Sequence, residues 1–172
     1  MLAERVICET PRLVLRRLTI ADLGIMAELN ADPEVSRFIG GVRTLDQTRE
    51  RLCEMIEQYE RYGFGKWGVE LRGTDELIGR CGPSVVEIDG VYEVELGYTF
   101  GRAHWGKGYA TEAAAAAMQY SFDVLGQRRL ISLIDRGNLA SARVALKNGM
   151  TYERTSEWQG ADVDVYSIHR ES

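Results

Sequence analysis

The stretch HWGKGYATEA, residues 104–113, indicates a glycine-containing loop that runs directly into a helix. Gly106 and Gly108 lack a Cβ atom, so the backbone can turn tightly there and another molecule can approach the main chain. The helix expected from Thr111 to Leu125 leaves its first N–H groups without partners and places the positive end of its dipole at the loop. Lys107 adds a cation. Together these features predict an anion site, and phosphate is the usual occupant of such a site.

The loop by itself does not establish a phosphate site, because a glycine pair before a helix is more often only a tight turn. Two familiar phosphate motifs are excluded. The four-residue spacer before Gly-Lys-Ser/Thr that defines the P-loop is missing, and so is a G-x-G-x-x-G with the distal acid of dinucleotide-binding folds. The segments on either side of the loop must therefore decide its function.

The whole chain has the composition of an ordinary globular protein. Its 172 residues, 45% hydrophobic and 27% charged, suit one domain with a full core. The net charge of −5 argues against nucleic acid as the main partner. No apolar run is long enough to span a membrane, and the first ten residues lack the apolar core of a signal peptide. These features predict a cytoplasmic protein without a membrane partner.

The cysteines carry no recognisable metal or disulfide pattern. Cys8, Cys53 and Cys81 are odd in number and far apart, without a CxxC pair, and the chain has only two histidines. Neither a disulfide framework nor a zinc site is expected. The prediction is three free thiols that are buried or half-buried, and no metal.

Hydrophobic periodicity and turn residues predict one α/β domain, residues 1–172, on a mixed, strongly twisted sheet. Strands are expected over residues 13–18, 65–71, 77–86, 91–100, 130–134, 151–158 and 163–169. Helices are expected from a cap at Thr19 or Asp22 to residue 30 and over residues 45–62, 111–125 and 138–148. Residues 31–41 are expected to form an irregular linker with a short turn. The strand at 130–134 should run parallel to the strand at 91–100, because the helix between them is a crossover connection.

Three of these segments, at these spacings, resemble the GNAT acyltransferase family, which uses acetyl-CoA. They are ELGYTF at 95–100 before the glycine loop, NLASARVALKNGM at 138–150 and the opening TPRLVLRRLT at 10–19. The opening, with WGVELRGTDELIGRCG at 67–82 and DVDVYSIHR at 162–170, is similar to the branch of RimJ/RimL-type ribosomal-protein N-terminal acetyltransferases. The resemblance covers nearly the whole chain.

The resemblance implies a sheet of about seven strands flanked by about four helices, in which the strand before the loop splays from its parallel neighbour. The pantetheine arm of CoA would lie in that gap, and the pyrophosphate would sit on main-chain N–H groups of the loop. The cofactor-binding residues that it implies are Leu96, Tyr98, Trp105, Gly106, Lys107, Gly108, Tyr109, Ala110, Thr111, Asn138 and Ser141.

One departure from the family pattern concerns the loop. The pattern is Arg or Gln, two residues, Gly, one residue, then Gly or Ala. Gly108 and Ala110 meet its second half, but Trp105 stands where the Arg or Gln is expected. One family contact is therefore missing, and Lys107 is the candidate for the lost cation.

A second departure concerns the proton donor. By resemblance, Asn138 would contact the pantetheine and Ser141 would lie near the thioester. Many relatives have a Tyr seven positions after this Asn as general acid, but Ala145 stands there. Ser141 or a water is left as the donor to the leaving thiolate. The plainer interpretations stay open, with Asn138 as only a helix cap and Ser141 as an ordinary first-turn serine.

Acyl transfer to an amine also needs a base and a polarised thioester carbonyl. Strand alternation along residues 91–100 places Glu93 and Glu95 on one face. Glu95 matches the acidic residue that several GNAT relatives use as general base, and a carboxylate in a cleft can accept a proton near neutrality. Glu93 is the reserve candidate. A bulge at Leu96 or Tyr98 would free a backbone N–H for the thioester oxygen. Both acids could equally be solvated surface.

The acceptor is constrained only loosely. Freeing an α-amine with a pKa near 8 at pH 7 costs about 1.4 kcal/mol, and a lysine-like amine near 10.4 costs about 4.6 kcal/mol. A weak base therefore favours an N-terminal or similarly activated amine. A small cationic amine would fit acidic side chains that the family fold brings to one mouth, namely Glu87, Asp89, Glu93, Glu95, Asp162 and Asp164. Trp158 and the last strands are candidates for a homodimer contact.

We therefore expect an acetyl-CoA-dependent N-acetyltransferase that acts by direct attack in a ternary complex. A covalent intermediate is not expected, because no cysteine lies in the motifs and no Ser/His pair is evident. The alternative is a catalytically silent module of the same fold that binds CoA or another ligand. A kinase is remote, because metal-ligating residues at motif spacing are missing.

Overall fold

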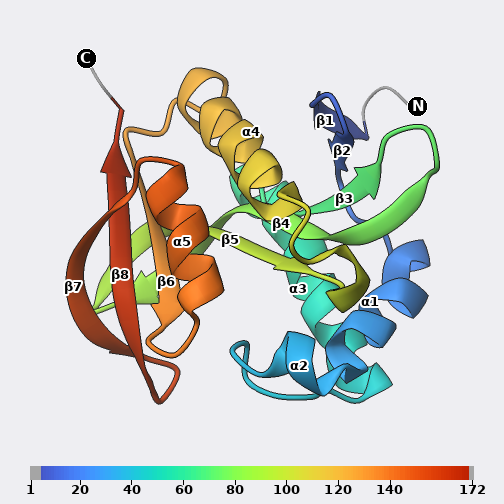
Figure 1. Ribbon diagram of the computed structural model, residues 1–172, viewed down its shortest axis with the longest axis horizontal. Coiled ribbons are helices and arrows are strands. Elements are labelled where there is room, and N and C mark those ends of the chain that lie inside the picture. Colours follow the sequence, from blue (N-terminus) through green and yellow to red (C-terminus); the bar gives the residue numbers. More distant parts are fainter. Residues whose placement is uncertain (1–4, 171–172) are drawn as a thin grey trace.

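The computed structural model describes residues 5–170 and contains one eight-stranded mixed sheet in the order β1-β2-β3-β4-β5-β6-β8-β7 (Figure 1). The strands are β1 (Val6–Glu9), β2 (Leu13–Arg16), β3 (Trp67–Leu71), β4 (Glu76–Ile88), β5 (Val91–Phe100), β6 (Arg129–Asp135), β7 (Thr151–Trp158) and β8 (Ala161–His169). The helices are α1 (Leu23–Ala31), α2 (Pro33–Ser36), α3 (Leu45–Tyr62), α4 (Tyr109–Asp123) and α5 (Leu139–Lys147), with short 3-10 turns η1 (Ile20–Asp22) and η2 (Arg102–His104). The predicted α/β class with a mixed sheet is confirmed.

Helix α3 shows why the sequence specifies this part of the fold. Thr44 and Gln47 form a capping box, in which each side chain accepts a hydrogen bond from the other residue's backbone N–H. Gly63 ends the helix with a φ of 78°, a left-handed conformation that glycine adopts without a Cβ penalty. Leu52 and Tyr59 on its inner face are buried. The predicted range 45–62 is confirmed.

The β4–β5 hairpin keeps one register along its whole length, from the Ile88–Val91 pair to the Gly79–Phe100 pair. The turn residues Asp89 and Gly90 both have positive φ values, 53° and 74°, as a two-residue hairpin turn matched to the strand twist requires. Because no register shift occurs, the predicted bulge in β5 is wrong.

Strand β6 runs parallel to β5, as predicted, but the two share a single pair, Glu95 with Ile131. Beyond that pair the strands diverge while β6 stays fully paired with β8. Helix α4 packs across β4 and β5 through small side chains, and Ala113, Ala114 and Ala117 are at most 1% exposed. Figure 1 shows α4 and α5 over one face of the sheet, with α3 behind it.

Several expectations need correction. The sheet has an additional edge strand, β1, and the linker contains a one-turn helix, α2, which Asp32 caps through the Glu34 N–H. Helix α4 begins at Tyr109 and ends at Asp123, two residues before each predicted end. Cys53 is exposed, because it lies on the outer face of α3, whereas Cys8 is half-buried and Cys81 is buried. Within residues 5–170, the helices are too short or too polar to cross a membrane.

A buried ion pair joins β2 to η1. The guanidinium of Arg16 donates to both carboxylate oxygens of Asp22, at 3.0 and 2.9 Å, and also pairs with Glu70. Burial by itself would raise the pKa of Asp22, but hydrogen bonds from Arg16 and from the Thr19 N–H outweigh it, so the pKa of this carboxyl is lowered. The ionised carboxylate is therefore part of the folded state.

We expect Asp22→Asn to lower the free energy of unfolding by about 3–5 kcal/mol at pH 7, because it leaves a buried guanidinium without its main partner. The folded-state pKa of Asp22 is depressed, so this stabilisation is present above the unfolded pKa of about 3.9 and is lost as the pH falls through the folded value. Urea unfolding at several pH values measures it. The control Asp46→Asn breaks an exposed pair with Arg49 and should change stability by less than about 0.5 kcal/mol. Equal effects of the two substitutions would contradict the prediction.

Candidate active site

A cleft of about 590 Å³ opens where β5 and β6 diverge. Its walls come from α3, the connection before α3, strands β4 to β6, the start of α5 and the β7–β8 hairpin. Of the predicted site residues, Glu95, Leu96, Tyr98, Asn138 and Ser141 line it. The cleft passes between the two strands, because it reaches side chains on the α3 face and on the α5 face of the sheet.

The divergence leaves main-chain groups of β5 facing the cleft. Pro83 of β4, which has no N–H, pairs with Leu96, so Leu96 directs its own polar groups toward β6. Its carbonyl accepts a hydrogen bond from the Ser132 hydroxyl at 2.6 Å. Strand alternation points the N–H of Tyr98 to the same side, beyond the last β5–β6 pair at Glu95 and Ile131. The main-chain donor expected from a bulge thus arises from strand divergence.

Glu95 is the buried carboxylate of the cleft, with 6% of the residue exposed. The Lys66 Nζ atom lies 3.2 Å from its Oε2 atom, and the Ser84 hydroxyl donates to the same oxygen at 3.4 Å. Lys66 lies over Gly97, where an added Cβ would come within 2.6 Å of Nζ. The absence of a side chain at position 97 therefore makes room for the ion pair.

Glu93, the reserve base, is placed differently. Its carboxylate accepts two hydrogen bonds from the guanidinium of Arg129, both at 3.2 Å, and the residues lining the cleft do not include it. Of the two acids on this face, the structure brings only Glu95 to the cleft.

The start of α5 forms the wall of the cleft on the face of the sheet opposite α3. Asn138 caps the helix, because its side-chain oxygen accepts the Ser141 N–H at 3.1 Å. The Tyr98 hydroxyl donates to the Ser141 carbonyl at 2.7 Å, and burial raises the pKa of Tyr98 well above its ordinary value. Within residues 5–170 the Ser141 hydroxyl has no hydrogen bond. The contact between Tyr98 and α5, across 43 residues, was not predicted, and no local sequence signal could have revealed it.

The glycine loop has the conformation of an anion site. Gly106 and Gly108 adopt φ values of 73° and 80°, and the first helical hydrogen bond of α4 runs from the Glu112 N–H to the Gly108 carbonyl. No acceptor among residues 5–170 bonds the N–H groups of residues 106–111. The N–H groups without a partner therefore include those of Lys107, Tyr109, Ala110 and Thr111. A run of unpaired N–H groups at a helix N-terminus suits a phosphate.

Arg12 holds this loop in place, and it was not identified from the sequence as a residue of the site. Its guanidinium donates to the Lys107 carbonyl at 2.9 Å and to Glu112 at 2.6 Å, and it lies 4.7 Å from the centre of the Tyr109 ring. Trp105, which stands where the resemblance predicts Arg or Gln, is half-exposed and donates its indole N–H to the Phe100 carbonyl at 2.8 Å. Lys107 and Arg12 therefore both place a cation at the loop, although 95 residues separate them in sequence.

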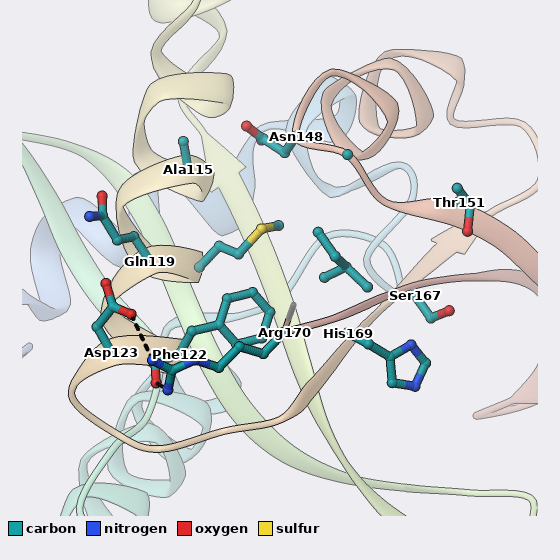
Figure 2. Close-up of a pocket in the computed structure, with 12 residues that line it drawn as sticks. Ala115, Gln119, Phe122, Asp123, Asn148, Thr151, Ser167, His169 and Arg170 are labelled. Atoms are coloured by element: carbon teal, nitrogen blue, oxygen red, sulfur yellow. Dashed lines mark hydrogen bonds and ion pairs between the residues drawn. The ribbon is translucent and has the colours of Figure 1, made fainter. Parts of the chain in front are cut away.

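A second groove, of about 740 Å³, lies between the C-terminal half of α4 and the ends of β7 and β8 (Figure 2). Arg170 donates to the Phe122 carbonyl at 2.6 Å and pairs with Asp123. None of the predicted site residues lines this groove, so the cleft is the candidate active site.

The acidic mouth expected from the sequence is largely neutralised. The structure pairs Asp89 with Arg154, Glu93 with Arg129, Glu95 with Lys66 and Asp164 with Arg136. The remaining two acids, Glu87 and Asp162, are exposed. Within residues 5–170 no group of three or more His, Cys, Asp or Glu side chains could hold a metal ion.

Comparison with known proteins identifies the family. The acetyltransferase (GNAT) domain model matches residues 12–151. The uncharacterized protein YkkB of Bacillus subtilis (strain 168) is 38% identical over 135 residues, which are 78% of each chain. A crystal structure of an acetyltransferase from Agrobacterium tumefaciens str. C58 is 32% identical and superposes with a TM-score of 0.84, covering 95% of this chain and 94% of that one.

A more distant structure shares the fold. RimL, a ribosomal L7/L12 alpha-N-protein acetyltransferase solved in complex with coenzyme A, is 20% identical, with a TM-score of 0.80 over 95% of this chain and 97% of its own. The family model and YkkB each cover more than three quarters of the chain, and they agree with the sequence-based resemblance. The chain therefore belongs to the GNAT acetyltransferase family and is an acyltransferase.

Proposed function

We propose that this protein transfers the acetyl group of acetyl-CoA to a primary amine by direct attack in a ternary complex. One observation carries the proposal. The cleft between the diverging strands contains a buried carboxylate, Glu95, and the same strand, β5, leads into a loop with unpaired N–H groups at residues 106–111. Family membership indicates the class of reaction. This arrangement provides a carboxylate that can accept a proton and N–H groups that can bind the cosubstrate.

The residues present fit the cosubstrate. The N–H groups of residues 106–111 would hold the pyrophosphate, and Lys107 would add a cation. The gap beyond the Glu95–Ile131 pair would receive the pantetheine arm, beside Leu96, Tyr98, Asn138 and Ser141. When bound, acetyl-CoA supplies an activated thioester, and the chain's own residues orient it and move protons.

Three groups have assigned roles in this proposal. Glu95 accepts the proton of the attacking amine, directly or through a water. The Tyr98 N–H, which faces the gap, donates to the thioester oxygen as charge develops on it. The Ser141 hydroxyl, unengaged within the described residues and lining the cleft, donates a proton to the departing sulfur. A tyrosine in the position usual for the family is excluded by Ala145.

The acceptor in this proposal is a protein N-terminus or a small-molecule amine. An α-amine is the easier substrate for a single carboxylate base, since freeing it at pH 7 costs about 3 kcal/mol less than freeing a lysine-like amine. RimL, which shares the fold, is named for an alpha-amine of a protein. A cleft of about 590 Å³ also has room for a small-molecule amine.

Thiol release from acetyl-CoA tests the proposal. We expect the purified protein to release CoA when N-terminal peptides or small primary amines are added, and to acetylate the amine, as mass spectrometry would show. The matched control is the same panel with each amine already acetylated. Binding of CoA without release in the presence of any amine would overturn the proposal in favour of a silent binding module.

A further inference from the structure

The half of the cleft that faces α3 is lined by four basic side chains. They are Arg43 before α3, Arg51 on α3, Lys66 before β3 and Arg80 on β4. Two of them have carboxylate partners, since Lys66 pairs with Glu95 and Arg51 pairs with Glu54 at 3.2 Å. Arg43 and Arg80 pair with no carboxylate among residues 5–170.

Arg80 is the most unusual of these residues. It is only 7% exposed, and the one hydrogen bond that its side chain makes within residues 5–170 is a long contact of 3.4 Å with the side-chain oxygen of Asn30. A guanidinium has five N–H donors, so most of those of Arg80 have no acceptor among residues 5–170. Burial first, and then the charges of Arg43 and Arg51, lower the pKa of Arg80 to about 10, which still leaves it charged at neutral pH.

Arg43 adds a second unbalanced charge. Its guanidinium donates to the Ile39 carbonyl at 2.5 Å. Burial, and then the charge of Arg51, lowers the pKa of Arg43. Burying charge without a counter-ion is costly, and like charges that converge add to that cost. An arrangement of this kind is stabilised by an anion that enters the cleft.

The strand register places this basic group on the same side of the sheet as Glu95. In the β4–β5 ladder Arg80 pairs with Thr99 and Ser84 pairs with Glu95. Four residues along one strand separate these two pairs, which is about 13 Å. The pair between them is Gly82 with Gly97, and Lys66 lies over Gly97 beside Glu95. Arg80 and Glu95 both line the cleft. A molecule in the cleft can therefore reach both Glu95 and the guanidinium groups.

We propose that the acceptor carries an oxyanion, a carboxylate or a phosphate, and that Arg80, Arg43 and Arg51 bind it while the amine lies at Glu95. This inference rests on the proposed acetyl transfer and names its substrate class. Guanidinium groups bind both oxyanions by paired, charge-assisted hydrogen bonds. It replaces the small cationic amine expected from the sequence, because the acids behind that expectation are mostly paired and the inner cleft is basic.

Matched acceptors test the inference. Amino acids are compared with their amides, and O-phosphoethanolamine with ethanolamine, by thiol release under identical conditions. We expect the anionic member of at least one pair to have the higher kcat/KM, by roughly 10- to 100-fold, the range for a charge-assisted hydrogen bond. The pair that shows the preference distinguishes a carboxylate from a phosphate.

Two substitutions on α3 form a matched control. Arg49 and Arg51 each make one exposed i,i+3 ion pair, with Asp46 and Glu54, but only Arg51 lines the cleft. Arg51→Gln and Arg80→Gln should lower kcat/KM for the anionic acceptor by about tenfold or more and leave the neutral one within about threefold. Arg49→Gln should change neither. Arg51→Gln keeps the test valid if Arg80→Gln fails to fold.

The outcomes separate the inference from the proposed function. A preference for the neutral member of each pair, or equal losses for both members in Arg51→Gln, would overturn the inference while acetyl transfer stands. If no amine releases thiol, the proposed function fails. The anion site is then judged by calorimetric titration of inorganic phosphate, with CoA saturating the loop. Binding that weakens in Arg51→Gln but not in Arg49→Gln supports the site, and no binding to the unmodified protein overturns it.

Discussion

Replacing Glu95 by Gln is expected to lower kcat by roughly 10²–10⁴, the usual contribution of a general base. The amide is nearly the same size and can keep the contact with the Ser84 hydroxyl, so the cleft retains its shape. It cannot accept a proton, and it loses the ion pair with Lys66. The amine would then reach the thioester still protonated. Steady-state rates over a range of pH measure the effect, and the limb of the profile that reports the base should disappear.

The matched control is Glu93→Gln, the same change two residues along the same strand. Glu93 is held by Arg129 and lies outside the cleft lining, so its loss should change kcat by less than about threefold. If Glu95→Gln leaves the pH–rate profile unchanged, the base is Glu93 or a chain of waters. The result for Glu93→Gln then decides between those two.

Replacing Gly108 by Val is expected to weaken CoA binding by about 100-fold or more in titration calorimetry. At a φ of 80° a β-branched residue costs about 1–3 kcal/mol, so the loop would leave this conformation and its N–H groups would turn away. A Cβ there would also lie 3.4 Å from the Arg12 guanidinium, which braces the loop. Losing one or two charge-assisted hydrogen bonds to phosphate accounts for the expected loss.

Gly126 offers a control three residues beyond the C-terminal end of the same helix. It has a φ of 68°, and an added Cβ would meet nothing within 4 Å. Gly126→Val should therefore cost a similar amount of stability and leave the affinity for CoA unchanged. Tight binding of CoA to Gly108→Val would show that the pyrophosphate lies elsewhere, and the cosubstrate placement would be wrong.

Much of the fold was predictable because its signals are local. The predicted bounds of α3, β5 and β7 match the structure, since periodicity and turn residues define them. The edge strand β1 was missed because it has only four residues and its pairing with β2 shifts register between Val6 and Cys8. Helix α2 is a single turn that begins at Pro33, and it is too short for hydrophobic periodicity to reveal it.

The site was predictable only where it is made of consecutive residues. The glycine loop and the start of α5 are short segments, so their backbone could be inferred from sequence. The brace between Arg12 and Glu112 and the grouping of Arg43, Arg51 and Arg80 depend on side chains that meet only after the sheet is assembled. The pairing of the acids at the predicted mouth could not be foreseen for the same reason. The sequence shows which residues are charged but not which of them form ion pairs.

The lone β5–β6 pair has a consequence for the molecule as a whole. The sheet consists of a five-stranded part, β1 to β5, and a three-stranded part, β6 to β8. Between these parts only Glu95 and Ile131 are paired. An extended ligand that hydrogen-bonds to both β5 and β6 would act as an additional strand and join the two parts of the sheet. Heat resistance of this protein would then report how well its cosubstrate is supplied, because ligand that binds only the folded chain favours folding by mass action.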